Sequence, residues 1–175
     1  RAVTSLMLHH GLRIGEALAL AVEDVEVDYT PPQPYVGPYL PRVTVHVRRN
    51  AQRLKVDGHT RMVVQPPKTA AGQREVPIMA VDVPLMLHQL NVYAPAQPAT
   101  VHTAEGPVEL RLFTTTATGQ MVMDTSYRSV LNRVEDAHGV TREINPHSGR
   151  RWLITRLAEQ GAHLKEIGRL LGQDR

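Results

Sequence analysis

The chain has 175 residues, a formal net charge of +3, and 42% hydrophobic residues. This length and composition are typical of one globular domain that buries about two thirds of its unfolded-chain surface. The chain contains no cysteine, which excludes disulfide bonds and thiolate metal sites. No apolar run approaches the roughly 20 residues that cross a bilayer, so no membrane association is expected. The first residue is Arg1, and the charged start does not resemble a signal peptide, which predicts a chain that begins inside a longer reading frame.

The N-terminal region is predicted to be helical. Apolar residues recur at helical spacing over residues 2–21, and Gly11 is expected to bend or interrupt this helix. Residues 30–41 contain too many prolines for a helix or a central strand, so a loop is expected there.

The middle of the chain is predicted to form a three-stranded antiparallel meander. Residues 42–49 alternate β-branched with polar side chains and are expected to form the first strand, and residues 61–68 and 73–78 are expected to form the other two. Turn-forming residues separate them at 56–60 and 69–72. Lys68 then lies on or beside the second turn.

The rest of the chain is predicted to be mostly helical. Residues 94–110 are rich in proline and threonine and are expected to be irregular, and residues 111–115 form a short apolar segment. Helices are expected over four stretches with apolar periodicity and capping residues: 81–94, 124–139, 145–161 and 163–172. The fold class expected is therefore α+β, mainly helical, with one small antiparallel sheet.

Burial within these helices is predicted from periodicity. Asp82 is a candidate N-cap. An inward-facing stripe is expected on helix 124–139, from Tyr127, Val130, Leu131 and Val134. On helix 145–161, three side chains are expected in the core: Trp152, Leu153 and Leu157.

One pair of residues suggests phosphate chemistry, and a second pair has the same spacing. His147 and Arg150 lie three residues apart at a predicted helix N-terminus, where backbone N–H groups favour anions. Arg13 and Glu16 are also three residues apart. Each pair also has a simpler interpretation. His147 and Arg150 would be an ordinary polar first turn of a helix, and Arg13 and Glu16 would be a surface ion pair.

The order of these motifs resembles the catalytic domain of the tyrosine recombinase (phage integrase) family. The first arginine box is "GLRIGEALAL" at residues 11–20, and the second runs from Pro146 to Gly172, ending in a Leu-Gly pair. Two separated motifs in the right order are far harder to reach by chance than one. The resemblance covers nearly the whole chain and implies the fold of that catalytic domain.

The resemblance assigns roles to five residues. It implies that Arg13 and Arg150 clamp the scissile phosphate with their planar guanidinium groups. It makes His147 a hydrogen-bond donor or general base, and it makes Lys68 the acid that protonates the leaving 5′-oxygen. Glu16 matches an acidic position that would support Arg13, with a helix-surface charge as the alternative.

The resemblance also implies the reaction and the partners. A tyrosine attacks a DNA phosphate and forms a 3′-phosphotyrosyl link, which a second DNA end reverses, so the family performs site-specific recombination and integration. Because the phosphodiester energy is kept, neither ATP nor a metal nor another cofactor is expected. The expected partner is double-stranded DNA, on which the full-length protein is expected to assemble as a homotetramer. The expected location is the bacterial cytoplasm, in association with the nucleoid, and the gene is expected to belong to a bacterium or a phage.

The sequence departs from the family pattern in two places. The residue after the Leu-Gly pair is Gln173, where the family usually has histidine or tryptophan, and glutamine can still donate a hydrogen bond to a phosphate oxygen. All of the tyrosines precede His147, so none matches the nucleophile: Tyr29, Tyr35, Tyr39, Tyr93 and Tyr127. Residues 1–175 are thus expected to be a fragment of the catalytic domain that binds DNA without cleaving it and is monomeric. Neither the N-terminal DNA-clamping domain nor the tyrosine segment is visible.

Several alternatives stand beside this interpretation. Lys55 competes with Lys68 as the lysine at a sheet turn. Residues 157–172 also resemble a helix-turn-helix, as in a DNA-binding protein without catalytic activity. The nine histidines are scattered, so no metal site is expected. Several arginines are candidates for contacts with phosphates along the DNA: Arg48, Arg49, Arg53, Arg61, Arg74, Arg151 and Arg156.

Overall fold

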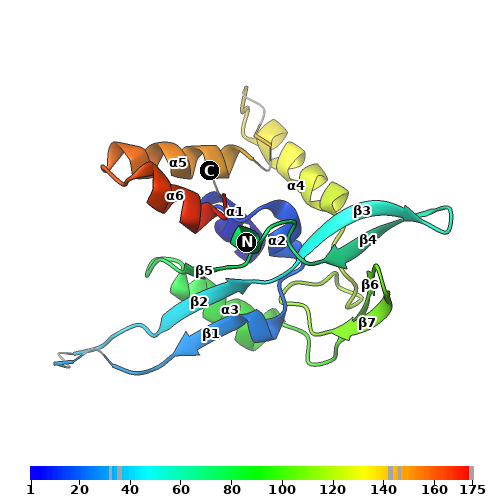
Figure 1. Ribbon diagram of the computed structural model, residues 1–175, viewed down its shortest axis with the longest axis horizontal. Coiled ribbons are helices and arrows are strands. Elements are labelled where there is room, and N and C mark those ends of the chain that lie inside the picture. Colours follow the sequence, from blue (N-terminus) through cyan, green and yellow to red (C-terminus); the bar gives the residue numbers. More distant parts are fainter. Residues whose placement is uncertain (32, 35–36, 142–143, 146, 174–175) are drawn as a thin grey trace.

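Most of the helices lie apart from the two sheets, whereas α3 (Val83–His88) packs against the first sheet. A computed structural model describes the chain except for residues 32, 35–36, 142–143, 146 and 174–175. Helices α4, α5 and α6 lie on one side, the two β-sheets lie on the other, and α1 and α2 lie between them (Figure 1). These helices are α1 (Ala2–Leu8), α2 (Ile14–Leu18), α4 (Asp124–Ala137), α5 (Ser148–Glu159) and α6 (Leu164–Leu171). No described helix is long and apolar enough to span a membrane.

The N-terminal helical region is interrupted at Gly11, as predicted. Between α1 and α2, Gly11 has a φ of +68°, a left-handed conformation that glycine adopts without steric penalty. A Cβ atom at this position would lie 3.0 Å from a methyl carbon of Leu153 in α5. The glycine therefore allows α5 to approach the break between the first two helices. α2 is shorter than expected and ends at Leu18.

The first sheet contains two of the predicted strands. Its antiparallel order is β1-β2-β5, with β1 (Val25–Asp28), β2 (Arg42–Val47) and β5 (Arg74–Pro77). Val45 pairs with Val25 on one side and Val76 on the other, and this row of valines is buried. The β-branched alternation thus predicted both strands correctly, because one face of the sheet is in the core.

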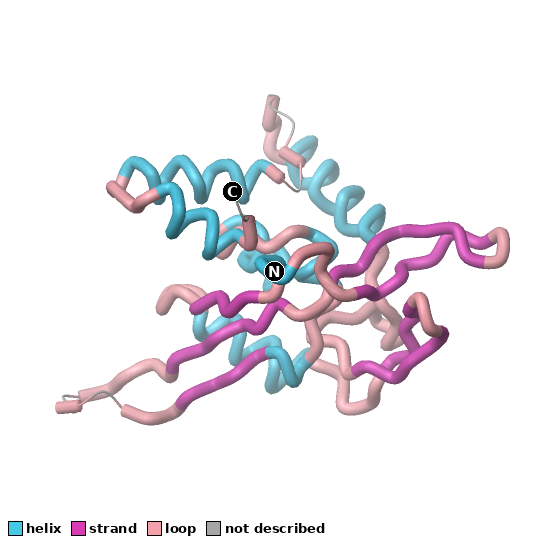
Figure 2. The backbone as a smooth tube through the Cα atoms, in the orientation of Figure 1, coloured by secondary structure: helices cyan, strands magenta, loops and turns pink. Residues whose placement is uncertain are grey.

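The second sheet shows that the predicted three-stranded meander is wrong. β4 (His59–Gln65) pairs with β3 (Asn50–Val56) instead of β2, across a turn at Asp57 and Gly58 that both have positive φ. Such an Asp-Gly turn matches the right-handed twist of a hairpin. The hairpin projects beside the body of the molecule (Figure 2). The turn at 56–60 is confirmed, but its first strand is one that the sequence analysis did not predict.

Residues 94–110 are not irregular, which also corrects the sequence analysis. They contain β6 (Ala99–Thr103) and β7 (Gly106–Leu110), an antiparallel hairpin that joins β4 through a parallel pairing of β6. The four-stranded order is β3-β4-β6-β7. The α+β class is confirmed, but the described chain has two sheets in place of one small sheet in a mainly helical fold.

The core lies where α1, α2 and the first sheet meet. Leu112 and Phe113, from the predicted apolar segment, are completely buried there. The predicted helix 81–94 is present as α3 (Val83–His88), extended by a π-helical turn over Gln89–Tyr93. Asp82 is its N-cap residue, but its carboxylate binds His9 and His10 in place of a helix N–H group.

Two predictions of burial are wrong. No described residue of α4 is fully buried. Tyr127 of the predicted inward stripe is partly buried against the core, but Val130 and Val134 are 46% and 51% exposed. Trp152 is 53% exposed, with the guanidinium of Arg156 lying 5.8 Å from its ring centre. Its neighbour Leu153 is buried against Ile167 and Leu171 of α6, as expected for a core residue.

Candidate active site

A pocket of about 670 Å³ opens between α2, the second sheet and the end of α6. The residues before β5 (66–73), which we call the lysine loop, form one wall. The lining residues are Arg13, Glu16, Asn50, Gln52, Pro67, Lys68, Thr69, Gly72, Gly172 and Gln173. Four candidates from the sequence analysis are thus gathered in one place: Arg13, Glu16, Lys68 and Gln173.

Arg13 is held at the start of α2 by Glu16. The Arg13 backbone N–H donates to Glu16 Oε2 at 2.8 Å, and its Nη1 donates to Glu16 Oε1 at 2.8 Å. The Glu16 side chain is only 2% exposed, whereas that of Arg13 is 37% exposed. The pair is therefore no ordinary surface ion pair, because a buried carboxylate holds an arginine that still reaches solvent.

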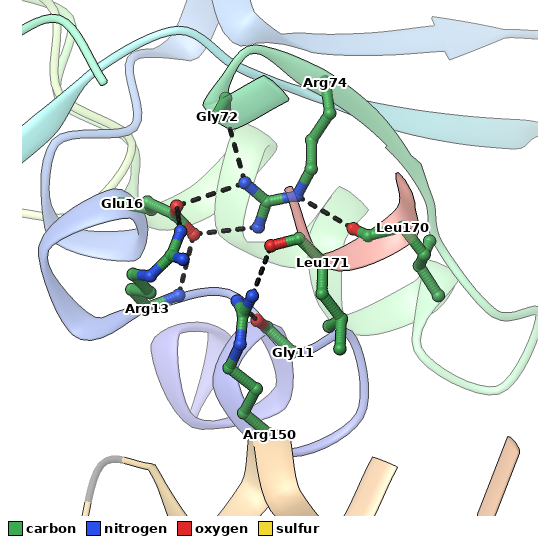
Figure 3. Close-up of polar contacts among 8 residues, drawn as sticks. All are labelled: Gly11, Arg13, Glu16, Gly72, Arg74, Arg150, Leu170 and Leu171. Atoms are coloured by element: carbon green, nitrogen blue, oxygen red, sulfur yellow. Dashed lines mark hydrogen bonds and ion pairs between the residues drawn. The ribbon is translucent and has the colours of Figure 1, made fainter. Parts of the chain in front are cut away.

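Glu16 also binds a second arginine, Arg74, the first residue of β5. Arg74 Nη2 donates to Glu16 Oε2 at 2.8 Å and Nη1 donates to Oε1 at 3.1 Å, so the carboxylate lies between two guanidinium groups (Figure 3). Burial by itself would raise the pKa of Glu16. The hydrogen bonds and charge of Arg74, together with the donors of Arg13, outweigh it and leave this pKa below its usual 4.5.

Arg150 lies directly behind this pair. It projects from α5 and donates through Nη1 to the Gly11 carbonyl at 3.0 Å and through Nη2 to the Leu171 carbonyl (Figure 3). The residue is 6% exposed. Burial, followed by the nearby charge of Arg13, lowers the pKa of Arg150 to about 10, so it stays cationic at neutral pH. In this structure its donors face backbone carbonyls rather than the pocket.

The structure distinguishes the two candidate lysines. Lys68 is exposed on the lysine loop and lines the pocket. Lys55 lies next to the end of β3, beside the hairpin turn, and is absent from the pocket lining. Only Lys68 shares a cavity with Arg13.

His147 is not brought into the pocket. It is exposed at the N-cap position of α5, where its backbone N–H donates to Asn145 Oδ1 at 3.0 Å. The first turn of this helix is covered by α1, since a Cβ on Gly149 would lie 2.7 Å from the Leu8 Cα. Pro146, where the second box was taken to begin, is outside the described residues.

The sequence analysis missed the role of Arg74 and the contributions of β3. Arg74 was expected to contact DNA phosphates, but its side chain is 5% exposed and points at Glu16. Asn50 and Gln52 line the pocket from β3, a strand that was not predicted. The alternation of "REVP" signals a strand but carries no information on which face Arg74 takes or which partner it meets.

Other polar clusters differ from this one. A smaller hollow of about 340 Å³ is lined partly by Arg48 and Arg49, but both arginines pair with Asp24. Within the described part of the chain, no group of three or more histidine, aspartate or glutamate side chains is arranged to hold a metal ion. No tyrosine is among the described residues that line the larger pocket.

Neither protein-family models nor curated proteins match this sequence. Solved structures do match. The Tn1549 transposon integrase, solved in complex with transposon right end DNA, is 19% identical with a TM-score of 0.72, over 99% of this chain and 50% of the integrase. XerA recombinase is 14% identical with a TM-score of 0.65, over 99% of this chain and 48% of that protein. XerH site-specific recombinase, bound to difH substrate, is 15% identical with a TM-score of 0.53, over 99% and 39%.

The chain thus spans about half or less of the length of these solved proteins. At such low identities the likeness concerns the course of the backbone. It extends over the helices and both sides of the pocket, since nearly the whole chain is matched. The chain has the tyrosine recombinase-type fold.

Proposed function

We propose that this protein breaks and rejoins DNA strands as a tyrosine-type site-specific recombinase or integrase, through a 3′-phosphotyrosyl intermediate. One observation carries the proposal. Arg13, Lys68 and Gln173 line one open pocket, although they come from distant parts of the chain. Together they offer hydrogen-bond donors and positive charge to a phosphodiester, the group that such an enzyme must bind.

The charge balance supports an anionic ligand. Three guanidinium groups, of Arg13, Arg74 and Arg150, surround one carboxylate, that of Glu16. Lys68 adds a further positive charge at the pocket wall. A site with such an excess of cations in partly buried surroundings attracts phosphate more strongly than an exposed cluster would.

The proposed roles follow from exposure. Arg13 reaches solvent, so it binds a non-bridging phosphate oxygen directly, and Glu16 orients it. Lys68 donates a proton to the 5′-oxygen when the P–O5′ bond breaks. Gln173 donates a hydrogen bond to the phosphate. Arg150 lies behind Arg13 and Glu16 and contributes its positive charge to the pocket. To contact the phosphate directly, Arg150 must give up its hydrogen bond to the Leu171 carbonyl.

We propose that His147 acts as a hydrogen-bond donor or general base. It lies at the start of the helix that carries Arg150, but outside the pocket lining. To act as donor or general base, it must meet the reacting phosphate when DNA enters. The same holds for the nucleophile, a tyrosine that the family resemblance implies.

The whole protein is proposed to contain further parts. The matched structures are about twice as long or more, which supports further parts in the whole protein. From the family resemblance, we propose that these parts include a DNA-clamping domain and a segment with the tyrosine. We propose that the full-length protein binds double-stranded DNA as a homotetramer. Residues 1–175 alone are expected to bind DNA as a monomer and to leave it uncut.

The helix-turn-helix alternative receives less support from the geometry. α5 and α6 are joined at Gly161, as that motif requires. However, Arg74 and Arg150 bind the carbonyls of Leu170 and Leu171 at the end of α6. A helix that only reads bases has no need of buried arginines at its C-terminus.

Capture of a covalent DNA adduct tests the proposal. Full-length protein is incubated with fragmented genomic DNA from its source, denatured with detergent, and examined for DNA that remains attached through tyrosine. We expect an adduct, and we expect Arg13→Ala and Lys68→Ala to reduce its formation about 100-fold or more. Arg42→Gln is the matched control, because the exposed Arg42 pairs with Asp28 on the first sheet, away from the pocket lining.

Two outcomes contradict the proposal. If wild-type protein binds DNA in a salt-dependent manner but never forms an adduct, a DNA-binding protein replaces the recombinase. If the adduct forms equally well without Arg13 and Lys68, the pocket is not the active site.

A further inference from the structure

Three separate parts of the chain meet at the buried side chain of Arg74. Besides its two bonds to Glu16 on α2, Arg74 donates through Nε to the Leu170 carbonyl at 2.8 Å and through Nη1 to the Gly72 carbonyl at 3.2 Å. Its side chain is 5% exposed. One guanidinium group therefore connects α2, the lysine loop and the end of α6.

The lysine loop is also packed directly against α6. Gly172, which ends this helix in a left-handed conformation, is so close that a Cβ would lie 2.6 Å from the Ala71 carbonyl oxygen. The same Cβ would lie 3.0 Å from Arg74 Nη1. The loop that carries Lys68 and the point where the chain leaves α6 are thus in contact, with Arg74 at their junction.

The direction of the chain beyond α6 is fixed by two arginines. Arg74 binds the Leu170 carbonyl and Arg150 binds the Leu171 carbonyl, at the last turn of the helix. Gln173, directly after Gly172, lines the pocket. Because these carbonyls have no partner within the helix, the arginines replace the helix hydrogen bonds that end there.

We propose that Arg74 is a positioning residue that sets the lysine loop, and with it Lys68, against the end of α6. The inference rests on the proposed function. Arg74 does not touch the substrate, because its donors are directed at Glu16, Gly72 and Leu170. Glu16 anchors it, so the carboxylate that holds Arg13 also holds the loop with the general acid.

The chemical consequence concerns one proton. When the tyrosine hydroxyl oxygen forms its bond to phosphorus, its proton passes to a general base, the role proposed for His147. The P–O5′ bond breaks at the same time, and the 5′-oxygen takes a proton from the Lys68 ammonium group. A misplaced Lys68 slows this step. A substrate with sulfur in place of the 5′-oxygen does not need the proton, because a thiol has a pKa of about 8.5 and its thiolate leaves unaided.

The test compares both substrates with the full-length protein. For Arg74→Gln we expect about 100-fold slower cleavage of ordinary DNA, with cleavage of the sulfur-substituted DNA nearly as in wild type. Lys68→Ala should show the same pattern and serves as the reference. Arg42→Gln, the control on the same sheet as Arg74, should leave both rates unchanged.

Equal loss on the two substrates would overturn the proposal, because Arg74 would then serve the phosphate clamp or the fold alone. Arg74→Lys guards against simple unfolding, since it keeps a charge toward Glu16 but lacks the planar fork that reaches Gly72 and Leu170 together. We expect it to be folded and to show a weaker form of the same pattern. A wild-type protein without any cleavage would instead reject the proposed function.

Amide hydrogen exchange on residues 1–175 tests the positioning itself, without any catalysis. In Arg74→Lys, exchange at residues 69–73 and at Gly172 should become at least about tenfold faster, while β1 and β2 remain protected. Unchanged exchange at the lysine loop would show that Arg74 does not hold it, whatever the protein does with DNA.

Discussion

Arg150 and Gly11 are joined by a hydrogen bond between residues 139 positions apart in the chain. The Arg150 guanidinium group thereby links α5 to the segment between α1 and α2, immediately before Arg13. The two arginines of the separate sequence boxes are brought together in this way. Their proximity depends on a backbone carbonyl, a partner that no sequence motif displays.

Arg150→Ala is expected to destabilise the protein by about 3 kcal/mol, because two buried carbonyls lose a charged donor. Arg151→Ala, next to it on the exposed face of α5, should change stability by less than about 0.5 kcal/mol. Urea unfolding followed by circular dichroism measures both. Equal effects would mean that the contacts to Gly11 and Leu171 contribute little.

Arg150→Ala in the full-length protein should abolish DNA cleavage while most of the DNA affinity is retained. Cleavage and binding are measured at a temperature at which the variant is folded.

Glu16→Gln is expected to lower the free energy of unfolding by about 3 kcal/mol, because it leaves the buried Arg74 without its counter-charge. The pKa of Glu16 in the folded state lies below 4.5. The stability that its ionisation contributes is therefore present above pH 4.5 and lost as the pH falls through the folded value. Glu23→Gln is the control, since Glu23 forms an exposed pair with Arg49. If both variants unfold alike at neutral pH, Glu16 is not the anchor of the site.

His10 predicts a second pH dependence, near neutrality. His10 is buried beside Asp82, and this burial lowers its pKa below 6.5. The Asp82 carboxylate acts in the opposite direction but does not outweigh burial, and the nearby His9 lowers the pKa slightly further. The unfolded chain therefore binds a proton that the folded chain does not, and stability falls as the pH drops below 6.5. The decrease should reach at most about 1.4 kcal/mol per pH unit.

Unfolding of wild type and His10→Gln from about pH 8 to about pH 5 isolates this effect from the other histidines. The difference in stability between the two proteins should shrink as the pH falls. A constant difference would mean that His10 does not titrate on unfolding in this range.

Truncation of Leu153 should cost much more stability than truncation of its neighbour Trp152. Leu153→Ala removes a buried side chain between α5 and α6 and should destabilise by about 3 kcal/mol. Trp152→Ala should cost less than about 1 kcal/mol, since the ring is half exposed and lies against Arg156. Circular dichroism is the measurement required, because Trp152 is the only tryptophan. A larger loss for Trp152 would restore the original prediction that it is a core residue.

Strong local patterns were sufficient to predict the helices and several strands. Positive φ at Gly11, Asp57 and Gly58 was signalled by the residue types themselves. β6 and β7 were missed because Pro95, Pro98 and Pro107 weaken the strand pattern. Proline is tolerated in β7, however, because this strand lies at the edge of its sheet.

Pairing and burial were harder to predict, since they depend on partners far away in sequence. The β-branched residues at 63 and 64 indicate a strand but do not reveal that β3 is its neighbour. The apolar stripe of α4 shows which face would be buried, whereas Val130 and Val134 are exposed because little of the described chain packs against that face. At the site, Arg13 and Lys68 were found through motifs, but Arg74 was not, because its function depends on Glu16, Gly72 and Leu170 together.

Val47 of β2 pairs directly with Arg74 of β5. Residues 48–73 therefore form a long insertion whose two ends lie next to each other on the first sheet. The β3–β4 hairpin occupies the outward part of this insertion, and Lys68 lies on its return. The entropic cost of bringing the two ends of such an insertion together rises only slowly with its length. Evolution can therefore lengthen, shorten or replace the hairpin tip around Asp57 and Gly58 while β2 and β5 stay in register.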